Sequence, residues 1–184
     1  MNIPWDSING FAGATGIGAI CVLGFFFIAD ASDSNVFHTL NSYASTATWG
    51  ILAAVPTITI SFLIGQFVIL LGTFLAGCFT SESFNQVDSI LIISRTQNEF
   101  LSQEYLRIKQ EKEMLCGSAL SFLVLGLGAF FEIKNLKSHR TIIVICGIIG
   151  LIAAVAFLVL GTQRINLLNR LTHSVSLNIE SLKN

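Results

Sequence analysis

The chain has 184 residues, of which 53% are hydrophobic and only 11% are charged, and its formal net charge is −1. Soluble globular domains carry about 25% charged residues, so this composition excludes an ordinary soluble domain. The length leaves room for one membrane domain over residues 1–184 and for no separate soluble catalytic domain. The near-neutral charge provides no basic surface for direct binding of nucleic acid.

Four long segments of the chain contain no Asp, Glu, Lys or Arg. These uncharged runs are residues 7–29, 34–81, 114–131 and 141–163. About 18 mostly apolar residues are enough for a helix to cross the hydrocarbon layer. Only helices and closed barrels satisfy every backbone amide there, and the alternation of barrel strands is absent. The sequence therefore predicts an all-α, polytopic membrane protein with spans at about 10–29, 48–79, 114–132 and 141–162.

Small residues recur every four positions in the first and fourth predicted spans, so in each span they share one helix face. They are Gly10, Ala14 and Gly18 in the first span and Cys146, Gly150 and Ala154 in the fourth. Small residues at this spacing allow two helices in a membrane to approach closely. We interpret the two faces as helix-packing and self-association surfaces, which predicts a homo-oligomer.

The second predicted span is too long for the hydrocarbon layer unless it is strongly tilted or bent. Pro56 removes one backbone donor, which predicts a kink near that residue. A re-entrant loop ahead of a shorter span is the alternative. The polar residues of this span can repair the kinked helix, join helices or line a pore; they are Thr57, Thr59, Ser61 and Gln66.

Residues 83–113 form the largest polar stretch, and we predict that they form a helix that runs directly into the third span. Opposite charges four residues apart, Arg107 with Glu111 and Lys109 with Glu113, support an exposed helix. Such a charged helix can be a solvated face, bind a soluble partner, or touch anionic lipid. The candidate partner-binding residues are Leu101, Tyr105, Arg107, Ile108, Lys109 and Lys112. The spacing of apolar residues over 164–182 predicts an amphipathic helix that extends the fourth span.

The distribution of Lys and Arg predicts the orientation of the chain. With the N-terminus inside, 7 of the 10 basic residues lie in cytoplasmic segments and 3 lie outside. The positive-inside rule therefore places both termini in the cytoplasm. We expect an integral, multi-pass membrane protein in contact with membrane lipids.

Several kinds of chemistry have no support in the sequence. The middle of each span lacks Asp, Glu, Lys, Arg and His, which proton-coupled transporters use. The chain contains no HExxH, CxxC, nucleophile elbow or Walker loop. We therefore predict that the protein is not an enzyme and has no catalytic, metal or cofactor site. The four cysteines fall within or beside the uncharged runs and are interpreted as small apolar packing residues.

Two functions remain compatible with these features. The first is an oligomeric membrane scaffold or sensor that presents cytoplasmic helices to a soluble protein. The second is an oligomeric pore or channel lined by the second span, since rings of hydroxyl groups or hydrophobic constrictions can gate a pore without charged residues.

In its layout, the chain resembles the small four-span membrane subunits of bacterial antiphage defence systems, such as the membrane component of Kiwa. The shared features are four spans that cover nearly the whole chain, short outer loops and a helical cytoplasmic platform. The resemblance implies a tetramer-like assembly that senses envelope disturbance and signals to a cytosolic DNA-binding effector. It concerns layout alone, so it assigns no functional residue.

Overall fold

The computed structural model describes residues 5–32, 47–80, 99–133 and 140–181. These residues form four α-helices and no strand: α1 (Trp5–Ser32), α3 (Ala47–Thr80), α5 (Glu99–Glu132) and α6 (Arg140–Ser181). Each helix is long and apolar enough to cross a membrane. The all-α, multi-pass fold class is therefore confirmed. Residues 83–98 of the predicted cytoplasmic helix, and residue 182 of the predicted C-terminal helix, lie outside the described residues.

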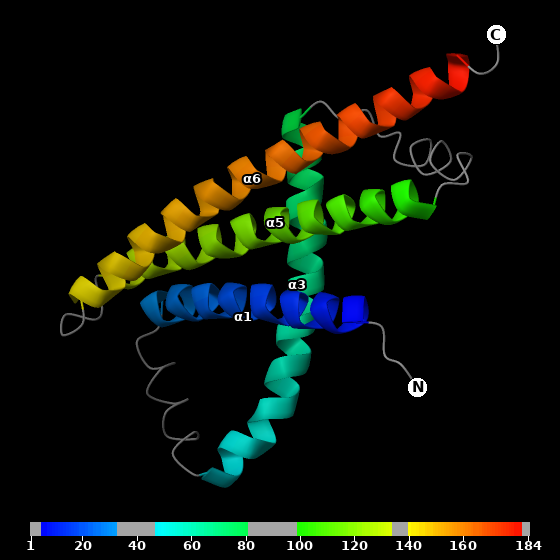
Figure 1. The fold of residues 1–184 in the computed structure, drawn as a ribbon. Coiled ribbons are helices and arrows are strands. Elements are labelled where there is room, and N and C mark those ends of the chain that lie inside the picture. Colours follow the sequence, from blue (N-terminus) through cyan, green and yellow to red (C-terminus); the bar gives the residue numbers. More distant parts are fainter. Residues whose placement is uncertain (1–4, 33–46, 81–98, 134–139, 182–184) are drawn as a thin grey trace.

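Three of the helices lie alongside one another, and the fourth crosses them (Figure 1). α5 and α6 form an antiparallel pair, and α1 lies next to α5 and runs in the same direction. α3 crosses this group at a steep angle. An apolar helix of 34 residues is about 50 Å long, which exceeds the hydrocarbon thickness.

The α5–α6 pair keeps one register along its length. Gly126 of α5 lies against Leu151 and Gly150 of α6, while Cys116, nearer the start of α5, lies beside Gly161. A β-carbon at Gly126 would lie 2.9 Å from Leu151 Cδ2. Glycine at this point therefore sets how closely the two backbones approach.

α1 and α3 cross where small residues from both helices meet. Ala14 and Gly18 of α1 lie against Ser61 and Gly65 of α3, and a β-carbon at Gly18 would collide with the Ser61 carbonyl oxygen. The glycine–alanine face predicted in the first span is thus used inside the chain. Gly150 and Ala154 of α6 are also buried within the chain, whereas Cys146 is exposed. The small size of the buried residues in these two faces therefore gives no evidence of self-association, because helices of the same chain already cover them.

α1 and α5 are joined by a polar contact in the middle of their apolar segments. The Ser121 hydroxyl donates a hydrogen bond of 2.9 Å to the Ile17 carbonyl oxygen, and Ser121 is fully buried. A buried cluster of Ile17, Cys21 and Val68 lies beside this bond. The cluster and the side chains packed against it come from α1, α3 and α5. An interhelical hydrogen bond of this kind contributes under about 2 kcal/mol in membranes, so side-chain packing contributes most of the contact.

α3 is continuous from Ala47 to Thr80, with Pro56 inside it. The re-entrant alternative is therefore wrong. The axis of α3 changes direction in its N-terminal, cyan part (Figure 1). Proline explains such a bend because its ring displaces the carbonyl four residues earlier and its nitrogen cannot donate.

α5 and α6 both continue as helices beyond the uncharged runs. Over residues 99–113 and 164–175 they stay in contact, with Tyr105 and Ile108 of α5 buried against Leu168 and Leu171 of α6. We call this paired segment the helical extension. Its apolar stripe pairs two helices that would be marginal alone in water, since short isolated helices are unstable there.

Candidate functional site

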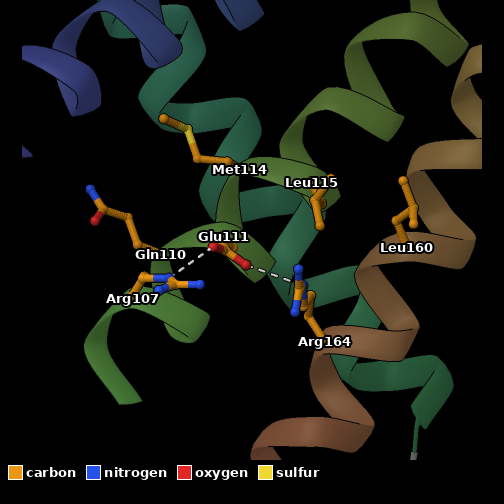
Figure 2. A pocket seen from close by; sticks show the side chains of 7 residues that line it. All are labelled: Arg107, Gln110, Glu111, Met114, Leu115, Leu160 and Arg164. Carbon is orange, nitrogen blue, oxygen red and sulfur yellow. Dashed lines mark hydrogen bonds and ion pairs between the residues drawn. The ribbon is translucent and has the colours of Figure 1, made fainter. Parts of the chain in front are cut away.

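A cleft lined by both charged and apolar side chains lies between α5 and α6 at the base of the helical extension. Its volume is about 540 Å³. It is lined by Arg107, Gln110, Glu111, Met114 and Leu115 of α5 and by Leu160 and Arg164 of α6 (Figure 2). The cleft lies at the level where the uncharged runs 114–131 and 141–163 meet the charged part of each helix. We call it the interfacial cleft.

An ion-pair network forms the polar side of the interfacial cleft. Glu111 accepts from Arg107 Nε at 3.3 Å on its own helix and from Arg164 Nε at 3.1 Å across the helix pair. Arg107 also contacts Glu104 one turn earlier, at 3.4 Å. Glu111 therefore holds the two guanidinium groups on either side of itself, as Figure 2 shows. Exposed ion pairs contribute at most about 1 kcal/mol to stability each, so the network orients these groups more than it stabilises the fold.

The two i, i+4 pairs predicted on the exposed helix are present. Arg107 meets Glu111, and Lys109 Nζ lies 4.0 Å from Glu113 Oε1. The bond from Arg164 to Glu111 was not predicted. It depends on the register of α5 against α6, which sequence spacing within one helix does not contain.

The candidate partner-binding residues divide into two groups in the structure. Tyr105, Ile108 and Lys112 are buried, and Leu101 is half-buried in a small crevice formed with Leu171 and Val175 of α6. Arg107 is exposed and Lys109 is half-buried. The apolar stripe expected to bind a partner is therefore covered by α6. The hydrophobic period identified a buried face correctly, but it did not identify the helix that covers it.

The candidate pore residues do not share one face of α3. Thr57 and Ser61 line a mostly apolar groove between α1 and α3, and Ser61 is buried. Pro56, Thr59 and Gln66 are exposed. The Thr59 hydroxyl donates to the Val55 carbonyl oxygen at 2.9 Å, which is the helix-repair role considered for it. Gln66 lies in the middle of the span, and its side chain is exposed. It makes no hydrogen bond to any of the described residues.

A pair of buried acids was not among the predicted sites. Glu132, the last residue of α5, is 0% exposed, and Asp30, near the end of α1, is 4% exposed. The two carboxyl groups lie beside each other. Neither carboxylate oxygen of Glu132 has a hydrogen-bond partner in the part of the chain that the structure describes. We call these two residues the acid pair.

The sequence contains a signal that points to the acid pair. Asp30 and Glu132 are the first charges after the uncharged runs of the first and third spans. Two spans that run in the same direction end at the same membrane surface, so their terminal acids lie at the same level. Only the packing of α1 on α5 brings them into contact.

The chain matches no family model, no curated protein and no solved structure.

Proposed function

We propose that the protein is an oligomeric membrane scaffold or sensor that presents its helical extension to a soluble cytosolic protein. The observation that carries this proposal is the continuity of α5 and α6, which pass unbroken from apolar spans into a paired, charged extension. A helix moves as a stiff rod over a few turns, so a shift or tilt of these spans also moves the extension. This geometry suits a protein that converts a change in the membrane into a change at a docking surface.

The exposed face of the extension offers a surface for such a partner. Phe100 and Leu106 are 73% and 57% exposed, although they lie on the polar part of α5. Gln103 lies between them along the helix, and Gln103, Arg107 and Gln110 share that side of the helix and are also exposed. Two apolar side chains surrounded by polar ones are typical of a docking surface for another protein. This surface replaces the buried stripe as the candidate partner-binding face.

The proposed signal and partner follow from the resemblance in layout. We place the protein in the bacterial cytoplasmic membrane with both termini inside, and we propose that the assembly responds to envelope disturbance during phage infection. The soluble partner would be a cytosolic DNA-binding effector docked on the extension, so this chain would not itself contact nucleic acid.

Placement of the extension in the cytoplasm predicts how a cysteine there will react. Gln103→Cys is expected to react with a membrane-impermeant maleimide in permeabilised cells and not in intact cells. Cys21 and Cys116 are buried, whereas Cys78 and Cys146 are exposed, so Gln103→Cys is made in a Cys78→Ser, Cys146→Ser background to remove their signal. Labelling of Gln103→Cys in intact cells would show that the extension is outside and would overturn the proposal.

Partner binding is tested with a photoreactive residue at position 103. We expect a crosslink to one soluble protein, and we expect Leu106→Asp to reduce it at least 5-fold because a charge would replace an exposed apolar contact. Leu127→Asn is the control for general damage to the protein, because Leu127 is exposed on the apolar part of the same helix. Equal crosslinking in the wild type and in Leu106→Asp would contradict docking at this face.

A pore is a second candidate function, supported by a polar stripe on α3. Thr59, Gln66 and Thr73 recur every seven residues and therefore follow one side of the helix. The Gln66 amide is costly to leave facing lipid, and a partner amide from another copy of α3 would satisfy it. Copies of α3 that meet along this stripe would form an oligomer with polar groups near its axis.

Gln66→Leu distinguishes a conducting stripe from one that only joins subunits. If the stripe lines a pore, the wild type in liposomes should pass ions, and the variant should lower the flux at least 10-fold with its oligomeric state unchanged. Leu70→Ile on the neighbouring exposed surface serves as the matched control. Absence of flux from wild-type liposomes would remove the pore function, and the scaffold proposal would be unaffected.

A further inference from the structure

We propose that the interfacial cleft binds the headgroup and upper acyl chain of one membrane phospholipid. The guanidinium groups of Arg107 and Arg164 would hold the phosphodiester, and Met114, Leu115 and Leu160 would contact the chain. The cleft shares Arg107 and Gln110 with the proposed docking surface on α5, but the lipid bound to the isolated protein can be measured without the soluble partner and without a pore.

The depth of the cleft matches the boundary of the bilayer. Met114 is the first residue of the uncharged run of α5, and Arg164 is the first charge after the uncharged run of α6. One end of the cleft therefore lies at the hydrocarbon, and the other end lies at the level of the headgroups. A phospholipid has its phosphate and its acyl chains in that same order.

The charged groups in the cleft have hydrogen-bond donors left for a phosphate. A guanidinium carries five N–H donors. The contact of Arg164 with Glu111 uses its Nε, and the contacts of Arg107 use Nε and Nη1. The side chains of Arg107 and Arg164 are 65% and 43% exposed, so their remaining donors are accessible to a ligand. Planar guanidinium groups suit phosphate because they can donate two parallel bonds to its oxygens.

Glu111 positions these donors without cancelling them. Its two oxygens each contact one arginine, so Arg107, Glu111 and Arg164 together carry a net charge of +1. The contact of Arg107 with Glu104 lies one turn further from the apolar span. With Glu104 included, the network of two arginines and two glutamates is neutral. The phosphate would therefore be held by the remaining N–H donors of the two guanidinium groups, between α5 and α6 and above the apolar residues.

The size and lining of the cleft favour a phospholipid over a small soluble ion. A volume of about 540 Å³ greatly exceeds the space that one inorganic phosphate needs. Gln110 adds a neutral donor and acceptor at the polar end, while three large apolar side chains lie at the other end. An acyl chain would cover the parts of these apolar side chains that face the cleft, which an inorganic phosphate at the arginines would not reach.

The test measures phospholipid that remains on the intact protein after extensive washing in detergent. We expect about one phospholipid per wild-type chain by native mass spectrometry, and at least a 5-fold lower occupancy in Arg164→Gln. Arg170→Gln is the matched control, because it removes the same charge from an exposed position on the same helix outside the cleft. Gln110→Glu is a second variant that adds negative charge to the cleft at an exposed residue and keeps both arginines; it should also lower occupancy.

The source of the phosphate group is tested by adding ligands to delipidated protein. Phosphatidylglycerol or phosphatidylcholine should raise the unfolding midpoint of the wild type and not of Arg164→Gln, whereas inorganic phosphate should have no effect. Stabilisation by either lipid supports the shared phosphodiester chemistry. Equal occupancy in Arg164→Gln and Arg170→Gln, or an equal effect of inorganic phosphate, would overturn the proposal.

Discussion

Gly18→Ala is expected to prevent α1 from packing on α3, although it adds only one methyl group. The new β-carbon would collide with the Ser61 carbonyl oxygen and would lie 2.7 Å from the Gly65 nitrogen. Both are backbone atoms, so no side-chain rotation can relieve the overlap. Overpacking of a tight core costs about 1–3 kcal/mol and sometimes more, and here two helices must separate. We expect a loss of at least that size in an unfolding titration in mixed micelles.

A control for this prediction lies two residues earlier on the same helix. Gly16 has no atom within 4 Å of the position that its β-carbon would occupy. Gly16→Ala should therefore be neutral or slightly stabilising, because alanine favours the helix more than glycine does. Similar unfolding midpoints for Gly18→Ala and Gly16→Ala would contradict the close crossing of α1 on α3.

Glu132→Gln is expected to stabilise the protein by about 1–3 kcal/mol, a magnitude typical of an unsatisfied buried polar group. In the wild type, two buried acids lie beside each other. While both are ionised, the Glu132 oxygens have no donor among the described residues, and a hydrogen bond to Asp30 requires one of the two groups to bind a proton. The amide has almost the same shape, removes one negative charge and can donate an N–H to Asp30. The same unfolding titration measures the gain.

Glu113→Gln tests whether this gain is specific to the acid pair. Glu113 lies on the same helix, but it is partly exposed and 4.0 Å from Lys109, so its replacement should change stability by less than about 0.5 kcal/mol. Asp30→Asn should reproduce the gain of Glu132→Gln, and the double variant should not add a second full gain because the two sites share one repulsion. Destabilisation by both single amide variants would show that the acid pair contributes favourably to the fold.

The membrane fold could be predicted because it follows from local composition. Hydrocarbon admits a segment such as residues 141–163 only as a helix, whatever else the chain does. The charge spacing on α5 was predictable for a similar reason, since Arg107 and Glu111 meet through the geometry of a single helix.

The contacts between helices could not be predicted with the same certainty. The four-residue pattern of Ala14 and Gly18 marks a face suited to close packing, but a second copy and α3 of the same chain would fit it equally well. The apolar stripe at Tyr105 and Ile108 presents the same ambiguity, and in the structure α6 covers it. Periodicity identifies a buried face, whereas the helix that covers the face depends on how all the helices pack together.

The sequence by itself determined that this chain forms apolar helices long enough to cross a membrane, because burial of backbone amides in hydrocarbon leaves few alternatives. The tertiary structure decided which polar groups meet. Arg164 reaches Glu111 through the register of α5 against α6, and Glu132 meets Asp30 through the parallel packing of α1 on α5. Both contacts join residues far apart in the chain, and their distances depend on helix–helix packing that no local pattern encodes.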